Sequence, residues 1–596
     1  MRITPRSGPY REITWPAILL GIVIGIMLSA CFTYAGLLLG FTIGGSAVAA
    51  ILGYGVLRGV LRKGTIVENN INQTIASGIN ISTGGIIFTV PAFYLMGQHF
   101  NTWLVTLAAI AGALLGILFI IPIRKQMIDL DRLRFPTGTA VATVLRSPGA
   151  GVAKSRLLLL GAAISAFVYF LSQFPVSFGE GRFLFGWERA FLPPEIDLGA
   201  MLHLPSFIDN VWALSLFSLG AGFITGRPGL VVLAGGVLAY WLVTPIAVFN
   251  QWLPTDLLQA YTTSAGTPEA ASAGQALSRW AHNEINRPIG IGMLIGGALA
   301  GVIIAVPSIK AAFRSLSRID LMSGAAEELP LKFLYMGVAV SFLVLLAAAY
   351  YTAPIGLWRA LSVAVVGTLW LGLAGIIVAQ ATGMTDWSPI SGLALIAVVL
   401  ILVMTNNSIP AAILLGATVA VAISECADMM QDLKTGFLVG ATPLRQQVMQ
   451  LAFVAIGPIV SLGVIAILWK SFGFGPDHNL TAPQAQALKA TIEGVVGGSV
   501  PWSKYLGGAV IGGLLSLTGV AGLGVLVGLS MYLPLAYILP YGLGCLINML
   551  LTKTRGVNWV ENKGVPFAAG LLVGEPLVVL VQSILIISGF IQPGGG

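Results

Sequence analysis

The sequence predicts an all-α polytopic membrane protein, and three observations support that fold class. Of the 596 residues, 56% are hydrophobic and only 9% are charged, whereas roughly 25% of a soluble domain is charged. The mean hydropathy is +0.90. The 74 glycines suit the close helix packing that occurs in lipid. So few charges cannot cover a water-facing surface of this size, so a soluble globular protein is excluded.

Long apolar runs predict how often the chain crosses the membrane. A helix needs ~20 apolar residues to span a hydrocarbon core of ~30 Å, and on this basis we expect about sixteen spans. The runs are 15–38, 42–61, 71–97, 103–123, 156–175, 209–226, 229–248, 287–308, 332–350, 357–380, 388–405, 408–424, 446–469, 515–532, 534–551 and 564–590.

Three shorter pieces, 135–147, 427–442 and 495–512, are too brief or too polar to span. We expect re-entrant or broken helices there, which survive at membrane depth when protein or a wet cavity surrounds them. For 132–147, a short interfacial helix is an equal alternative.

Basic residues gather in short loops between the apolar runs, within 58–63, 124–134 and 310–318. The positive-inside rule places such clusters in the cytoplasm. Counting alternate spans from a cytoplasmic N-terminus puts all three clusters inside and the acidic loop at 176–208 outside. We therefore expect a multi-pass protein of the cell inner (plasma) membrane. No nucleic-acid partner is expected, because the basic residues do not form one stripe or tail.

One internal similarity predicts two repeated halves. Residues 46–52 and 408–414 share five identities in seven, and polar segments at 68–78 and 426–436 follow them. The span count gives both copies the same orientation, so we expect a parallel duplication, which in transporters places a site at the repeat interface. Chance similarity between Ala-rich helices is the alternative.

The expected domain organisation follows this repeat. Residues 1–286 form the N-terminal half of the transmembrane domain, 287–331 a span and cytoplasmic connector, and 332–596 the C-terminal half. The two long polar stretches, 176–208 and 249–286, are too small to form separate soluble domains.

Ionisable residues within apolar segments mark candidate sites, because each is costly in a bilayer. Glu425, Asp428 and Asp432 are spaced i, i+3, i+7, which places three carboxylates on one helix face. We expect this face to exchange a proton or hold a cation. The alternative is a helix start whose acidic residues complement the helix dipole. Lys434 lies on a different part of the helix surface, so it is not automatically their ion-pair partner.

Amide side chains in the segment 68–78 are candidates for substrate binding. Asparagine and glutamine both donate and accept hydrogen bonds, so they can hold a peptide-like or carboxylate ligand without a fixed charge. Helix capping by Glu68 and its neighbours is an equal alternative. The candidate substrate-binding residues are Glu68, Asn69, Asn70, Gln73, Gln431, Lys434 and Asp386. For Asp386, which opens a span at a Ser-Pro turn, a simple N-terminal role is at least as strongly expected.

Glu575 lies well inside the last apolar run, and Pro576 follows it directly. A Gly-Glu-Pro triplet can break a helix and expose backbone groups to a ligand or ion. A packed glutamate neutralised by protonation is the alternative. The candidate proton- or cation-coupling residues are Glu425, Asp428, Asp432 and Glu575.

Known catalytic and metal-binding patterns do not occur in this sequence. The histidines and the three cysteines lack metal-ligand spacing. There is no Walker A loop and no GxSxG or HExxH motif. We therefore expect no catalytic residue, no metal site and no cofactor, and a protein that is not an enzyme.

Several long segments resemble one family. GTIVENNINQTIASGINISTGGIIFTVPAFYLMG at 64–97 is similar to the pattern of the oligopeptide transporter (OPT) family, and the first apolar stretch resembles its bacterial members. LRFPTGTAVATVLRS, GMTDWSPISG and ADMMQDLKTGFLVGATPLRQQ also match, the last resembling the yellow-stripe-like branch as well. These segments run from residue 5 to about residue 576 and occur in the family's order.

The resemblance implies secondary active, proton-coupled uptake of small peptides or peptide-like compounds, including metal chelates. Eukaryotic members carry small peptides and glutathione, and the yellow-stripe-like branch carries metal–nicotianamine complexes. The sequence departs from the pattern at Cys31, Thr33 and Tyr34, where we expect a more amide-rich stretch, so the substrate stays broad.

The expected partners are the lipid bilayer, the substrate and protons, with a homo-oligomer as an option. A channel or facilitator for a small polar solute is the alternative function. A membrane-embedded enzyme is the least expected.

Overall fold

The computed structural model describes most of the chain. It covers residues 11–591 apart from 41–43, 63, 147, 178–183, 185, 186, 188–190, 265–268, 305, 306, 308–327, 353, 354, 386, 387, 476, 477, 479, 498–500 and 519–521. The candidate Asp386 and the basic cluster at 310–318 lie outside the described residues.

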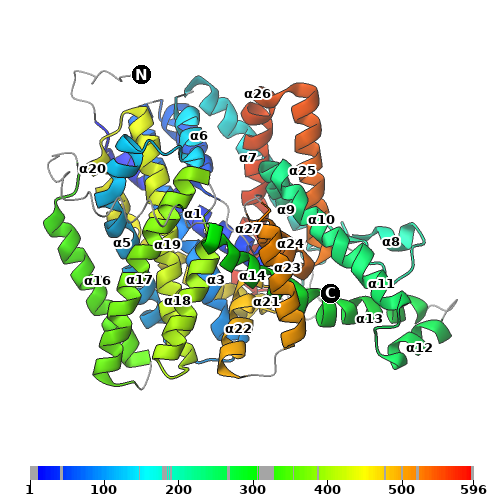
Figure 1. The fold of residues 1–596 in the computed structure, drawn as a ribbon. Coiled ribbons are helices and arrows are strands. Elements are labelled where there is room, and N and C mark those ends of the chain that lie inside the picture. The colour runs from blue at the N-terminus through cyan, green and yellow to red at the C-terminus, as the bar shows by residue number, and fades with distance from the viewer. Residues whose placement is uncertain are drawn as a thin grey trace. The chain divides into compact units, whose positions relative to one another are not determined.

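The chain forms two compact units, each built from two separate stretches of sequence (Figure 1). The first unit contains Met1–Arg156 and Val302–Gly498, and the second contains Leu157–Gly301 and Ser499–Gly596. The predicted boundaries at 286 and 332 concern the internal repeat, and they stay a prediction.

All regular secondary structure in the described part of the first unit is helical. Its helices are α1 (Trp15–Leu39), α2 (Ser46–Tyr54), η1 (Gly55–Val60), α3 (Ile66–Thr89), α4 (Pro91–Leu95), α5 (Thr102–Ile120), η2 (Ile121–Ile123), η3 (Lys125–Leu130), α6 (Pro136–Leu145), α16 (Leu331–Thr352), α17 (Gly356–Thr385), α18 (Ile390–Met404), α19 (Ile409–Val439), α20 (Pro443–Phe453), α21 (Ile456–Phe472) and α22 (Pro483–Val496). Helices α7 (Pro148–Ser172) and α14 (Arg287–Ile304) each contain a boundary between the units.

The second unit adds a two-stranded antiparallel sheet to its helices. Strand β1 (Glu195–Asp197) pairs with β2 (Val211–Ala213), with Ile196 opposite Trp212. The helices are α8 (Leu198–Met201), α9 (Leu216–Thr225), η5 (Arg227–Gly229), α10 (Leu230–Val237), η6 (Leu238–Val243), α11 (Thr244–Phe249), α12 (Thr255–Thr263), α13 (Glu269–Ala281), η7 (His282–Asn286), α23 (Trp502–Ser516), α24 (Leu523–Tyr532), α25 (Leu535–Arg555), α26 (Val557–Trp559), η9 (Val560–Gly564) and α27 (Val565–Ile587).

The helices confirm the predicted fold class, an all-α polytopic membrane protein. Within the described residues, 11 helical stretches are long and apolar enough to cross a membrane. The count of sixteen spans stays a prediction. Helix α6, at the piece expected to be re-entrant or interfacial, has 10 residues, and its length of about 15 Å is too short to span.

Helix α19 is the central helix of the first unit, and it packs against α3, α5, α17 and α18 (Figure 1). It runs without a break for 31 residues and ends at Gly440, whose φ of 82° suits a residue without a Cβ. The predicted division into a span at 408–424 and a separate piece at 427–442 is therefore wrong. Polar residues within the helix do not interrupt it, because neighbouring helices bury them and supply partners.

Helices α3 and α19 run antiparallel. Gln73 and Ser77 of α3 bond to Asp432 and Asp428 of α19, respectively. Farther along α3, Gly85 packs against Ala420, so residue numbers rise on one helix as they fall on the other. The expected parallel orientation of segments 68–78 and 426–436 is therefore wrong. The two similar regions also differ in structure. Segments 46–52 and 68–78 lie on separate helices, α2 and α3, whereas both later segments belong to one helix, α19.

The two ends of the first unit differ in chemistry. Gly337, near the start of α16, packs against Leu118, near the end of α5, so α16 starts beside the end of α5. Trp103 at the start of α5 and Trp358 at the start of α17 are 78% and 82% exposed, respectively, as in the aromatic belt of a membrane protein. We call this the aromatic end. The other end of α5 leads to Arg124 and the cluster at 124–134, which we call the basic end.

Helix α19 runs from the aromatic end to the basic end. Its residues Thr418 and Ala422 pack in that order against Gly112 and Gly116 of α5, so the two helices are parallel. The acidic residues at 425–432 therefore occupy the half of α19 that faces the basic end.

Candidate functional site

Three helices of the first unit, α3, α19 and α20, bring polar side chains together in its interior. Helix α3 begins with a capping box, in which the Thr65 hydroxyl accepts from the Glu68 N–H and the Glu68 carboxylate accepts from the Thr65 N–H. This start places the amide-rich segment that follows on a regular helix. Gln73 and Ser77, four residues apart, then share the face that meets α19.

The α3 side chains bond to two of the three predicted carboxylates. Gln73 Nε2 donates to Asp432 Oδ1 at 2.5 Å. Ser77 Oγ lies 2.8 Å from both Asp428 carboxylate oxygens, and Ser46 Oγ of α2 lies 2.6 Å from Ser77 Oγ. Because a hydroxyl has a single proton, Ser77 donates to Asp428 and accepts from Ser46.

Helix α20 contributes two glutamines to the same face of α19. Gln450 Nε2 donates to Glu425 Oε2 at 3.3 Å. Gln446 Nε2 donates to the Asp432 backbone carbonyl at 2.9 Å and to Thr74 Oγ1 at 3.0 Å. The two glutamines lie four residues apart, so they project from one side of α20.

Two glycines make room for these glutamines. A Cβ on Gly78 of α3 would lie 2.6 Å from Gln450 Cγ. A Cβ on Gly436 of α19 would overlap the Gln446 side-chain amide. Each glutamine side chain therefore lies directly against a helix backbone. Only glycine at positions 78 and 436 leaves room for it, because any other residue would add a Cβ there.

We call the set Gln73, Ser77, Glu425, Asp428, Asp432, Gln446 and Gln450 the polar cluster. Its three carboxylates extend over about 10 Å of α19, from the middle of the helix toward the basic end. Glu425, Gln73 and Gln446 are each 0% exposed. Such a concentration of buried polar groups is costly in a bilayer and typical of a transport pathway.

The polar cluster contains more hydrogen-bond acceptors than donors. Five of its buried oxygens have no partner among the described residues: Glu425 Oε1, Gln450 Oε1, Asp432 Oδ2, Gln73 Oε1 and Gln446 Oε1. Buried acceptors without donors are unfavourable by about 1–3 kcal/mol each. Chemically, the cluster can therefore take up species that supply protons or positive charge.

The other predicted ligand residues are placed differently. Glu68 forms the helix cap that was its alternative interpretation. Asn69 donates to the Ala50 carbonyl of α2 at 2.9 Å. Asn70 is 0% exposed, and within the described part of the chain neither its Oδ1 nor its Nδ2 has a hydrogen-bond partner.

Gln431 and Lys434 lie outside the polar cluster. The backbone carbonyl of Gln431 packs against Gly138 of α6. Lys434 Nζ lies 5.7 Å from the centre of the Phe437 ring. Within the described residues, neither side chain forms a hydrogen bond or ion pair with the three carboxylates.

Glu575 belongs to the second unit. Helix α27 continues through Pro576, so the predicted helix break at Gly-Glu-Pro is absent from this helix. The carboxylate accepts from Ser215 Oγ, at 3.1 and 3.0 Å, and from the Phe217 N–H at 3.2 Å, at the start of α9. Glu575 thus has donors that Glu425 lacks.

Sequence analysis missed Ser77, Gln446 and Gln450. A signal was present in the run PLRQQVMQL at 443–451, which places two amides at i and i+4 on a short helix. Glutamine is a common helix former, so this spacing has no meaning until the facing carboxylates are known.

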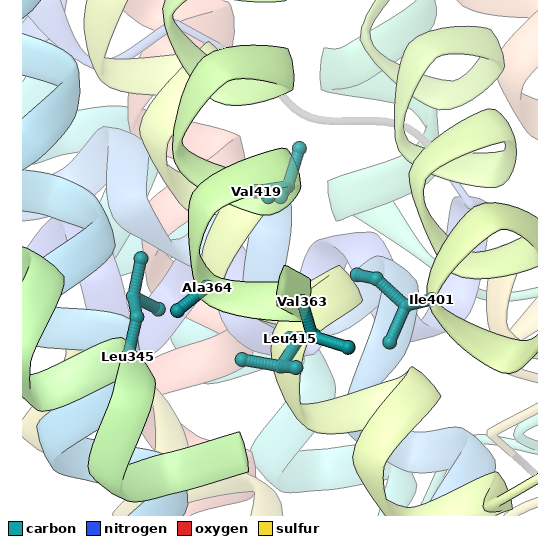
Figure 2. A pocket seen from close by; sticks show the side chains of 7 residues that line it. Leu345, Val363, Ala364, Ile401, Leu415 and Val419 are labelled. Carbon is teal, nitrogen blue, oxygen red and sulfur yellow. The ribbon is translucent and has the colours of Figure 1, made fainter. Parts of the chain in front are cut away.

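Two hollows of the first unit are separate from the polar cluster. One lies between α16, α17, α18 and α19, and apolar residues line it: Leu345, Val363, Ala364, Gly367, Ile401, Leu415 and Val419 (Figure 2). The other is lined by Phe88, Thr89, Ser391, Ala394, Leu395, Val398, Gln484, Ala487 and Leu488. The first hollow has no polar side chain to orient a polar solute. The second includes Thr89, Ser391 and Gln484 but no ionisable residue. The polar cluster is therefore the candidate site.

The chain is similar to known proteins along nearly its whole length. The profile of the "OPT oligopeptide transporter protein" family matches residues 12–586. A protein of Haemophilus influenzae described as "Putative oligopeptide transporter" is 28% identical, over 94% of this chain and 93% of the relative. "Metal-nicotianamine transporter YSL3" of Arabidopsis thaliana is 24% identical, over 98% of this chain and 93% of the relative.

Proposed function

The chain belongs to the OPT oligopeptide transporter family, and on this premise we propose that it is a secondary active transporter of small peptides or peptide-like compounds, including metal chelates. It imports them together with protons. We place it in the cell inner (plasma) membrane with its N-terminus in the cytoplasm, because the basic end of the first unit then faces inward.

The substrate class is supported by the relatives. Their descriptions include oligopeptides and metal–nicotianamine complexes, both of which carry amino and carboxylate groups. Buried amide side chains suit such ligands, since each amide offers a donor and an acceptor.

The single observation that carries proton coupling is the pairing of Glu425 with Gln450. The Gln450 amide donates to Glu425 Oε2, while Glu425 Oε1 and Gln450 Oε1 have no donor among the described residues. One proton on Glu425 Oε1 would convert it into a donor for Gln450 Oε1. A single proton therefore provides for both unpartnered oxygens and also removes a buried charge.

Loss of that proton would leave a buried carboxylate with a single hydrogen bond. This state is unfavourable unless the surroundings change, so deprotonation is linked to a rearrangement of α19 or α20. Asp428, which follows Glu425 toward the basic end, supplies the next carboxylate on a route for that proton.

Uptake into proteoliposomes tests the proposal. We expect an inwardly directed proton gradient to drive uptake of members of a panel of small peptides, glutathione and metal chelates. Glu425→Gln should abolish the gradient dependence, whereas the matched variant Glu575→Gln should retain it. Equal flux with and without a gradient would instead indicate a channel or facilitator. Absence of uptake for the whole panel would refute the substrate class.

A further inference from the structure

We propose that Asp432, Gln73 and Gln446 form a binding site for a small monovalent cation, for which Na⁺ is the test ion. The site lies nearer the basic end of α19 than Glu425 does and is separate from the proposed proton site. It goes beyond proton coupling, because it predicts an ion that binds whether or not transport takes place.

Both glutamines bond to Asp432, which fixes the orientation of their amides. Gln73 Nε2 faces the carboxylate oxygen Oδ1, and Gln446 Nε2 faces the backbone carbonyl. An amide oxygen in either position would oppose another acceptor, so the nitrogens must point there. Each Oε1 is therefore an acceptor rather than a misassigned nitrogen.

Three oxygens on these side chains are left without donors. Gln73 Oε1, Gln446 Oε1 and Asp432 Oδ2 have no hydrogen-bond partner in the parts of the chain that the structure describes. The three side chains are 0%, 0% and 1% exposed, respectively. Asn70, one helical turn before Gln73, is also fully buried, but its Nδ2 lacks a partner among the described residues as well as its Oδ1, so it does not add to the excess of acceptors.

A single proton cannot satisfy this set. Protonated Asp432 could donate from Oδ2 to one glutamine oxygen, but the second would stay unpaired at a cost of about 1–3 kcal/mol. At Glu425 there are only two unpartnered oxygens, Glu425 Oε1 and Gln450 Oε1, and one proton shared between them satisfies both. A cation bound between these side chains would, in contrast, take lone pairs from all three oxygens.

The ligand types select a hard cation of low charge. The site offers carboxylate and amide oxygens, which hard cations prefer, and lacks the sulfur and imidazole ligands that soft transition metals favour. Among the described residues, no group of three or more His, Cys, Asp and Glu is placed to hold a metal ion. Asp432 is the one carboxylate among the three proposed ligands, so the site itself contributes a single negative charge, whereas Asp428 bonds to Ser77. A single positive charge balances it.

Binding can be measured on the purified full-length chain in detergent, without substrate or gradient. NaCl should raise the unfolding temperature in a saturable way at constant pH, when choline chloride keeps the ionic strength fixed. Scintillation proximity binding of radioactive Na⁺ gives the affinity directly. K⁺, Li⁺ and choline then test selectivity.

Two variants remove the unpartnered amide oxygens at nearly constant volume. Gln73→Met and Gln446→Met should each weaken Na⁺ binding about tenfold or more. Gln582→Met, at a half-buried glutamine of α27 in the second unit that also has an unpartnered Oε1, should not change it. If the methionine variants fail to fold, Asp432→Asn removes the one carboxylate among the proposed ligands at constant shape and should abolish Na⁺ binding.

The proposal is overturned if Na⁺ stabilises the chain no more than choline, or if the methionine variants bind Na⁺ like the unmodified chain. These results leave proton-driven uptake untouched. Conversely, Na⁺ binding with no gradient-driven uptake would support the cation site while refuting the proposed transport mechanism.

Discussion

The two buried glutamates that hydropathy treats alike, Glu425 and Glu575, should respond differently to the same substitution. Glu575→Gln should destabilise the fold and leave proton-dependent uptake intact. Glu425→Gln should leave the fold stable and abolish proton-dependent uptake. The difference arises from the donors: Glu575 is held at the start of α9, whereas Glu425 has a single glutamine.

The magnitude for Glu575→Gln follows from its contacts. Glutamine keeps one acceptor oxygen but replaces the other with an NH₂ group, which cannot accept from Ser215 Oγ or from the Phe217 N–H. Loss of one charge-assisted hydrogen bond is worth about 1.5–3 kcal/mol. Loss of negative charge at a helix N-terminus adds about 0.3–1 kcal/mol. We therefore expect a loss of about 2–4 kcal/mol.

For Glu425→Gln we expect little loss of stability, because a neutral amide replaces a carboxyl group that the site already favours in its neutral form. The assay is unfolding in detergent, paired with uptake into proteoliposomes. Val581→Ala on α27, where the side chain is 58% exposed, is the stability control. If Glu575→Gln unfolds like the unmodified chain but loses gradient dependence, Glu575 is a coupling residue and this reasoning is wrong.

Three further predictions concern other parts of the structure. Gly436→Ala should displace Gln446 and lower stability by about 1–3 kcal/mol, as measured by unfolding in detergent, and unchanged stability would contradict the close packing. Glu12 accepts from the Thr442 N–H at the start of α20 and forms an ion pair with Arg445 at 3.1 Å. Glu12→Gln removes the ion pair, so it should loosen the start of α20 and speed tryptic cleavage there. Burial, with a smaller effect from a neighbouring cation, lowers the pKa of His282 from 6.5 to about 4. Its stabilising contribution should therefore be present above pH 6.5 and lost as the pH falls toward 4, and an NMR titration of the ring would show a normal pKa if this is incorrect.

Fold class was predictable because membrane spans depend on local composition. The length of an apolar run sets whether a helix can cross, and no tertiary information is needed. The division of α19 failed for a physical reason. The residues from Glu425 to Lys434 lower the local hydropathy, but α3 and α20 surround this part of the helix and supply partners for its carboxylates.

The candidate site was only half predictable. Spacing alone puts Glu425, Asp428 and Asp432 on one face, and the structure shows that this face is buried against α3 and α20. The facing glutamines of α20 could not be assigned, because their role depends on a tertiary contact. Similarly, no local pattern reveals that the start of α9 supplies donors to Glu575.

The length of α19 has an electrical consequence. Its 31 residues extend about 46 Å, well beyond a hydrocarbon core of ~30 Å. With the helix centred on the bilayer, Glu425 lies near the middle of the core and Asp432 within about 3 Å of its boundary. The membrane potential acts on a charge in proportion to the voltage it crosses, about 2.3 kcal/mol for a full crossing at 100 mV. A proton reaching Glu425 therefore moves through about half of the voltage drop, whereas an ion that reaches Asp432 from the basic end moves through almost none.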